Sequence, residues 1–260
     1  MFDFWQLVNN ENMKIYRRPR TWIMLGILLV LTLGISILFF SFNTDNTLTM
    51  WMPFEVCATV AILLITIFTV VISAESVAGE FTSGTIKLLL IRPWSRSKIL
   101  LSKYLALIMF ALFFMILLFA WNFLVNLIIF GYEGDVRMGQ DMAPLQYYTL
   151  MHLFELISLI VVVTLSFLIS TVFRSGGLAI GLSLFLLLGG NMITGLLAFL
   201  DYGWIKYLLF LNLSLSQYLG NGGPMIEGMS LGFSLSVLAG HYVVFIAITW
   251  YLFNKRDVAS

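Results

Sequence analysis

Six apolar runs, each long enough to cross a bilayer, constrain this chain more than any other feature of its sequence. They cover residues 21–42, 54–74, 99–130, 149–172, 177–200 and 233–253. Lipid offers the backbone no hydrogen-bonding partner, and the runs lack the alternation of barrel strands, so each is predicted to be helical. Only 10% of the residues are charged, against about 25% in soluble domains. The sequence therefore predicts an all-α integral membrane protein with six transmembrane helices, forming a single transmembrane domain over residues 1–260.

The distribution of basic residues predicts the orientation of the six helices. If the N-terminus is cytoplasmic, twelve of the fourteen Lys and Arg residues lie in inner segments, and only Arg137 and Lys206 lie outside. Such an excess of positive charge is typical of cytoplasmic loops. We therefore expect a multi-pass protein of the cell (plasma) membrane with both termini in the cytoplasm. The formal net charge of +1 gives no sign of nucleic-acid binding.

Two further segments are predicted to touch the membrane without crossing it. Residues 1–20 mix apolar and basic side chains before Pro19, which indicates an N-terminal amphipathic helix on the inner membrane surface. A plain basic anchor without a defined helix is the alternative. Residues 201–232 form the longest outer segment and are unusually apolar for a loop in water. They are predicted to form short re-entrant helices before the last span.

The cytoplasmic segment 75–98 is the most informative part of the chain. Gly84 permits a turn after the second span, residues 85–91 can form a short helix, and Pro93 ends it. Leu89 and Leu90 make this helix partly apolar, and an exposed apolar element needs a partner. The sequence predicts either a docking element for another protein or a loop packed against its own bundle.

This segment resembles the loop between the second and third spans in permeases of the ABC type-2 exporter family. Those loops carry a Glu-rich turn, then Gly-Thr, an apolar helix, and a Pro-x-Ser-Arg element that leads to a Lys. The matching residues are Glu75, Glu80, Gly84, Thr85, Pro93, Ser95, Arg96 and Lys103. The surface helix, the six spans and the re-entrant outer segment also match that family.

The resemblance implies a permease subunit of an ATP-driven ABC exporter, which forms the translocation path and couples to a separate ATPase. The family's short loop helix is a coupling helix that docks on the nucleotide-binding subunit. The implied coupling residues are Glu75, Glu80, Phe81, Gly84, Thr85, Lys87, Leu89, Leu90, Arg92 and Arg96. The implied partners are two ABC ATPase subunits, which carry ATP and Mg, and a second permease, identical or homologous.

No cofactor or metal site is predicted in this chain, and it is not expected to be an enzyme by itself. The run from Gly79 to Thr85 has the glycine spacing of a phosphate-binding loop, but Gly84 is not followed by the required Lys. His152 and Glu155 share a helical face, yet two ligands are too few for zinc, and His241 lies on another span. A hydrogen bond between His152 and Glu155 is the simpler expectation.

A few polar and small residues within the spans are weaker candidates. Polar side chains that could line a translocation path are Asn122, Asn126, Glu155 and Asn191, because intramembrane carboxylates tend to face a cavity. Small residues at helical spacing predict close helix packing, either inside the bundle or against a second permease. They are Gly177, Gly181, Gly232, Ser236 and Gly240.

Two other functional classes stay open. An intramembrane enzyme would use His152, Glu155 and His241, and a membrane scaffold or sensor would use ATPase subunits without moving a solute. The sequence does not indicate a transported substrate.

Overall fold

The computed structural model describes residues 2–44, 48–86, 94–200, 202–220, 223–224 and 226–255. The helices are α1 (Phe2–Tyr16), α2 (Pro19–Phe42), α3 (Trp51–Thr82), α5 (Arg96–Phe130), α6 (Pro144–Val172), α7 (Gly176–Leu197), η1 (Ile205–Tyr207), α8 (Leu209–Asn212), η2 (Leu215–Tyr218) and α9 (Leu231–Lys255). No strand occurs within those described ranges. Six of the helices, α2, α3, α5, α6, α7 and α9, are long and apolar enough to cross a membrane. The described residues are all-α, as predicted, and include six helices of the length and composition expected for membrane spans.

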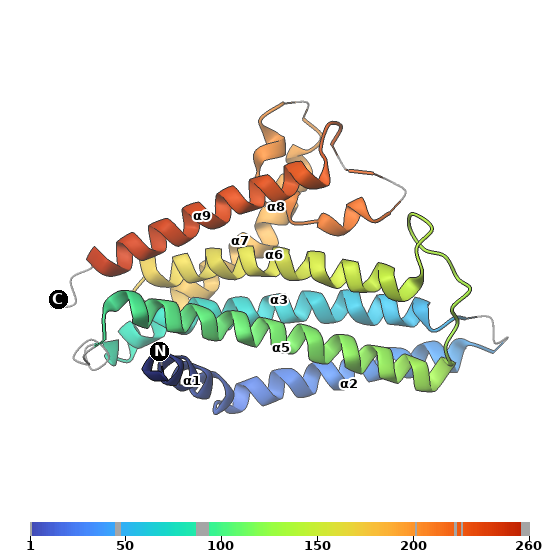
Figure 1. Cartoon of the computed structure of the whole chain (residues 1–260), viewed down its shortest axis with the longest axis horizontal. Coiled ribbons are helices and arrows are strands. Elements are labelled where there is room, and N and C mark those ends of the chain that lie inside the picture. The colour runs from blue at the N-terminus through green and yellow to red at the C-terminus, as the bar shows by residue number, and fades with distance from the viewer. Residues whose placement is uncertain are drawn as a thin grey trace.

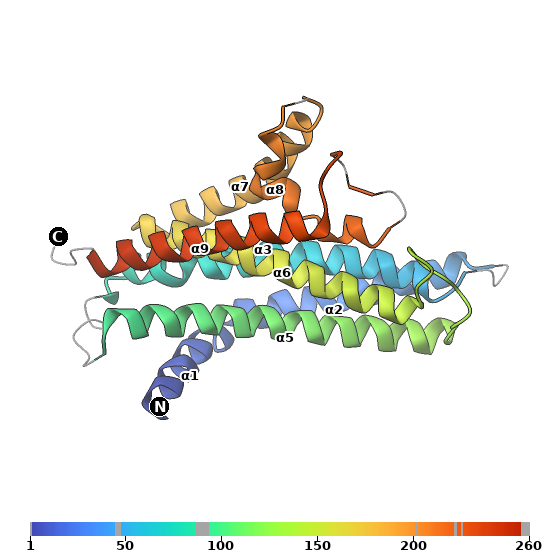
Figure 2. The same cartoon turned by 45° about the horizontal axis from the view of Figure 1, so that its top comes forward.

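The long helices form an elongated bundle in which α3 and α6 lie at the centre (Figure 1). Helices α2 and α5 pack on one side of this pair, and α7 and α9 pack on the other. The end that holds α1, the last turns of α3 and the first turns of α5 is called the α1 end below. The other end, with residues 131–143, is called the opposite end. Figure 2 shows α1 crossing α5 obliquely at the α1 end.

The junction between α1 and α2 is fixed by local chemistry. Pro19 occupies the first turn of α2, where a missing backbone N–H costs no hydrogen bond. Thr21 Oγ1 donates to the carbonyl of Ile15 at 2.6 Å, and Trp22 Nε1 donates to the carbonyl of Tyr16 at 2.8 Å. Carbonyls at the C-terminal end of a helix lack intrahelical partners. These two side chains therefore cap α1 and fix the angle between it and the first span.

Helix α3 runs beyond the apolar part of its span. The apolar run ends at residue 74, the helix was expected to continue to about Glu80, and α3 ends at Thr82. Gly84 then adopts a positive φ of 70°, which turns the chain away. Helix α5 starts after Ser95, whose side chain accepts from the backbone N–H of Lys98. Glu75 and Glu80 consequently lie on the last turns of a long, rigid helix.

Burial is uneven across the bundle. Phe110, Phe114 and Phe167 are fully buried between the central helices. In contrast, α7 and α9 expose large apolar side chains, including Phe185 at 64% and Val243 at 63%. Exposed apolar faces of this extent require lipid or another protein to cover them.

The short helices α8 and η2, in the segment between α7 and α9, pack back on the bundle. Helix α8 contacts α7 and α9, and η2 contacts α6 and α9. Leu215 is fully buried, and Ser158 Oγ on α6 donates to the carbonyl of Leu213 at 2.5 Å. The apolar character of the segment, noticed in the sequence, is explained by this packing.

Candidate functional site at the α1 end

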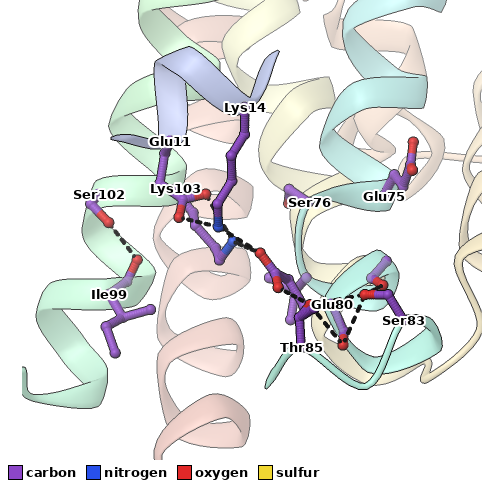
Figure 3. A network of polar contacts seen from close by, with 12 residues as sticks. Glu11, Lys14, Glu75, Ser76, Glu80, Ser83, Thr85, Ile99, Ser102 and Lys103 are labelled. Carbon is purple, nitrogen blue, oxygen red and sulfur yellow. Dashed lines mark hydrogen bonds and ion pairs between the residues drawn. The ribbon is translucent and has the colours of Figure 1, made fainter. Parts of the chain in front are cut away.

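The main polar feature of the bundle is a buried lysine near the start of α5. Lys103 is only 2% exposed, and its Nζ donates to Glu11 Oε2 of α1 at 2.9 Å and to Glu80 Oε1 of α3 at 3.2 Å. A buried charge is stable only when it is paired and hydrogen-bonded. Lys103 therefore ties three helices, α1, α3 and α5, at one point (Figure 3).

A second lysine completes this cluster. Lys14 Nζ on α1 lies 2.8 Å from Glu11 Oε1 and 2.7 Å from Glu80 Oε1. Burial alone would lower the pKa of Lys14, but the carboxylates of Glu11 and Glu80 outweigh it, so the pKa lies above its ordinary value. Two lysines and two glutamates thus balance one another. We call Glu11, Lys14, Glu80 and Lys103 the charge cluster.

Glu80 also connects the charge cluster to the loop that follows α3. Its Oε1 accepts from both lysines, whereas its Oε2 accepts from the hydroxyl of Thr85, beyond the Gly84 turn. Figure 3 shows Glu80 between the lysines on one side and Thr85 with Ser83 on the other. The carboxylate of Glu80 therefore contacts Thr85 of the loop as well as the lysines of α1 and α5.

Glu75 makes a separate link, about one and a half helical turns before Glu80 in α3. It accepts from Arg18 Nη1 at 2.8 Å and also from Arg20, so it holds the start of α2 against α3. The seven charged side chains, four basic and three acidic, line one cleft of about 280 Å³. The ion pairs in the cleft connect α1, α2, α3 and α5, and the basic side chains exceed the acidic ones by one.

The remaining coupling candidates are placed as follows. Phe81 packs against the main core, and Arg96 Nη1 donates to the carbonyl of Asn254 at 3.0 Å, which joins the start of α5 to the end of α9. Lys87, Leu89, Leu90 and Arg92 lie outside the described residues. The coupling helix itself therefore stays a prediction.

The candidates for a translocation path divide into two groups. Asn126 is fully buried and bonds Ser36 of α2 and the carbonyl of Asn122 on its own helix, and Asn122 is 1% exposed. Glu155 lines a cavity between α3, α6 and α7 and accepts a hydrogen bond from Ser216. The side chain of Asn191 is outside what the structure describes.

The two histidines bond their own helices. His152 Nδ1 lies 2.8 Å from the carbonyl of Tyr148, and His241 Nδ1 lies 2.9 Å from that of Val237. The expected hydrogen bond between His152 and Glu155 is absent from the described contacts, because each side chain has another partner. Among the described residues, no three His, Cys, Asp or Glu gather as metal ligands would.

The small residues of α7 and α9 that were expected to pack closely have no close neighbour among the described residues. A Cβ added at Gly177, Gly181, Gly232 or Gly240 would meet no atom within 4 Å. Ser236 is exposed and bonds the carbonyl of Gly232. Their role in packing against a second subunit stays a prediction.

Sequence reasoning missed four members of the cleft: Glu11, Lys14, Arg18 and Arg20. Their partners lie 55 or more residues away in the chain, apart from the pair Glu11 and Lys14. One available signal was Lys103, a lone cation in an otherwise apolar stretch of α5. Such a residue needs an acidic partner from another helix.

Comparisons with known proteins identify the family. A family model described as "Protein of unknown function (DUF2705)" matches residues 22–259. The chain is 32% identical to "Uncharacterized protein YhcI" of Bacillus subtilis (strain 168), over 98% of this chain and 99% of that protein. It is 29% identical to "Uncharacterized membrane protein YdbK" of the same organism, over 75% of this chain and 78% of that protein.

These matches correct the resemblance drawn from residues 75–103. No permease of the ABC type-2 exporter family is found, so that family identification is wrong. The residues that suggested the resemblance have local structural roles here: Gly84 makes a turn after α3, and Ser95 caps α5. Turn and cap residues of this kind serve any helix–loop–helix connection. The protein is a multi-pass membrane protein, and it belongs to the family described as protein of unknown function, DUF2705.

Proposed function

We propose that this protein is the membrane-spanning subunit of an exporter driven by ATP hydrolysis on a separate polypeptide. The α1 end would face the cytoplasm, and the ATPase would bind the loop 75–98. The observation that carries the proposal is the position of Glu80, a residue of α3 that contacts Thr85, just beyond the Gly84 turn, as well as lysines of α1 and α5. Force applied to the loop then reaches three helices at once.

The orientation is supported by charge. Among the described residues, Arg137 and Lys206 lie away from the α1 end, whereas the other nine Lys and Arg residues belong to segments at that end. Because cytoplasmic segments carry the excess of Lys and Arg, the α1 end is assigned to the cytoplasm of the cell membrane. Trp5 of α1 is 55% exposed while Val8 is fully buried against the bundle. The exposed face of α1 would then lie among lipid headgroups, as expected of a surface helix.

The mechanism follows from the same contacts. ATP-dependent closure of a pair of ATPase subunits would move the two loops of a permease dimer, and each loop would shift the equilibrium between two packings of its bundle. The uncovered apolar faces of α7 and α9 supply surface for a second permease, identical or homologous. Residues 201–232 would form a re-entrant segment at the outer leaflet. Specificity for a solute would come from the membrane-embedded cavities.

The ATPase interaction is tested by purification from native membranes. The tagged full chain is isolated in a mild detergent, and co-purifying polypeptides and Mg²⁺-dependent ATP hydrolysis are measured. Replacing Leu89 and Leu90 together by Asp is expected to remove the ATPase polypeptide and the activity. The control, Asp135→Asn in the exposed loop of the opposite end, is expected to keep both.

Retention of the ATPase by the Leu89→Asp, Leu90→Asp double variant, or absence of any ATPase from the purified complex, contradicts the proposal. Transport into reconstituted vesicles separates an exporter from a scaffold or sensor, because a scaffold would hydrolyse ATP without moving a solute.

A further inference from the structure

A second cavity, distinct from the cleft at the α1 end, lies within the membrane-spanning part of the bundle. It has a volume of about 360 Å³ and is enclosed by α3, α6, α7 and residues 213–216. Small-molecule sites in proteins have volumes of about 300–1,000 Å³ and combine apolar walls with a few polar groups. This cavity has that composition, with leucines on α6, α7 and α8's C-terminal side and one carboxylate, Glu155.

Glu155 is deep in the span rather than at its edge. It is the twelfth residue of α6, which starts at Pro144 and runs for 29 residues, so it lies about 16 Å along the helix from that start. An ionised carboxylate at such a depth is costly, and intramembrane carboxylates usually have a defined partner. The identity of that partner decides what the cavity holds.

The described parts of the chain supply little to balance this carboxylate. Ser216 Oγ donates to Glu155 Oε1 at 3.2 Å, and this is the one hydrogen bond found for the carboxyl group among the described residues. The nearby Ser158 hydroxyl donates to the carbonyl of Leu213 instead. The ion pairs of the described residues involve Glu11, Glu75 and Glu80 and do not include Glu155. A carboxylate can accept about four hydrogen bonds, so the described residues meet only a part of that capacity, and Glu155 is one of the residues that line the cavity.

The walls and the opening of the cavity indicate which chemical groups a ligand would need besides one that pairs with the carboxylate. Leu159, Leu187 and Leu213 form an apolar wall beside the carboxylate. Leu63 and Leu188, at the rim, are 53% and 56% exposed, so the cavity opens on a surface that the spans present to lipid. A ligand that enters from lipid and meets a carboxylate needs both a hydrocarbon body and a positive charge.

We infer that this cavity binds an amphipathic organic cation, with its charged centre against Glu155 and its apolar body along the leucine wall. As a statement about exported cargo, this inference rests on the proposed transporter function. As a statement about binding, it can be measured without ATP or a partner subunit. Failure of the binding test therefore leaves the proposed function standing, and failure of the ATPase test leaves the binding site standing.

The test uses the purified full chain in lipid nanodiscs and the probe tetraphenylphosphonium, an apolar cation. Tetraphenylborate, which has the same shape and the opposite charge, is the matched control ligand. Saturable binding of the phosphonium, and not of the borate, is expected. Because removing one member of a desolvated charge pair strongly weakens binding, Glu155→Gln is expected to weaken phosphonium binding by about tenfold or more. Asp135→Asn, which removes an equal charge from an exposed loop, is expected to leave binding unchanged.

A second variant protects the test against misfolding. Leu188→Trp fills the rim from an exposed position and keeps Glu155, so it is expected to reduce binding while the thermal stability of the ligand-free protein is retained. Equal binding of the phosphonium and the borate, absence of saturable phosphonium binding, or unchanged binding in Glu155→Gln would overturn the inference.

Discussion

Replacing Lys103 by Met removes the cation at the centre of the charge cluster and keeps the length of the side chain. Lys103 is 2% exposed, and the carboxylate side chains of Glu11 and Glu80 are 9% and 13% exposed. Breaking a buried ion pair by removing one partner costs about 3–5 kcal/mol, because the other charge is left uncompensated. Lys14 still contacts both glutamates at 2.8 and 2.7 Å. The expected loss therefore lies at the lower end, about 3 kcal/mol in the free energy of unfolding.

The assay is unfolding by sodium dodecyl sulfate in mixed micelles, followed by circular dichroism. Lys98→Met is the matched control, because Lys98 is on the same helix but exposed, and exposed substitutions usually change stability by less than about 0.5 kcal/mol. The double variant Lys103→Met, Glu80→Gln leaves one lysine and one glutamate in balance. It is expected to be more stable than the sum of the two single changes predicts, by at least about 1 kcal/mol. Equal stabilities for the two Lys→Met variants, or strict additivity, would refute the reasoning.

Two further predictions concern orientation and packing. In intact cells, a membrane-impermeant maleimide is expected to label Asp135→Cys at once and Ser83→Cys only after permeabilisation. Both positions are exposed, they lie at opposite ends of the bundle, and the native cysteine is buried. Labelling in the reverse order would invert the assigned topology. Gly190→Ala is expected to destabilise the protein by about 1–3 kcal/mol, because the added Cβ would lie 2.3 Å from the ring of Phe210. The control is Gly189→Ala, whose added Cβ would meet no atom nearer than 3.8 Å. Thermal unfolding in detergent measures both, and equal midpoints would contradict the packing described for α7 and α8.

The spanning helices could be predicted from sequence because the bilayer imposes one rule on every residue of a span. A run such as 21–42 has to be helical wherever its neighbours lie, since its backbone finds no other hydrogen-bonding partner in lipid. The structure accordingly places a helix on each of the six apolar runs. The ends of the helices obey a weaker rule. The apolar run of α3 stops at residue 74, but the helix continues to Thr82, and Glu75 and Glu80 on this extension pair with basic side chains of other helices.

The charge cluster was beyond sequence reasoning for a related reason. Nothing local in the sequence indicates that Glu11 will meet Lys103, because 92 positions separate them and the meeting depends on α1 lying across α5. Glu80, by contrast, was selected through a family resemblance that proved wrong, and the structure gives it a different justification. Its two oxygens face different parts of the molecule, with the lysines of the bundle on one and the loop hydroxyl of Thr85 on the other. A residue with these contacts connects the loop to the helices in any family, so the proposed coupling at Glu80 depends only on its bonds to Lys14, Lys103 and Thr85.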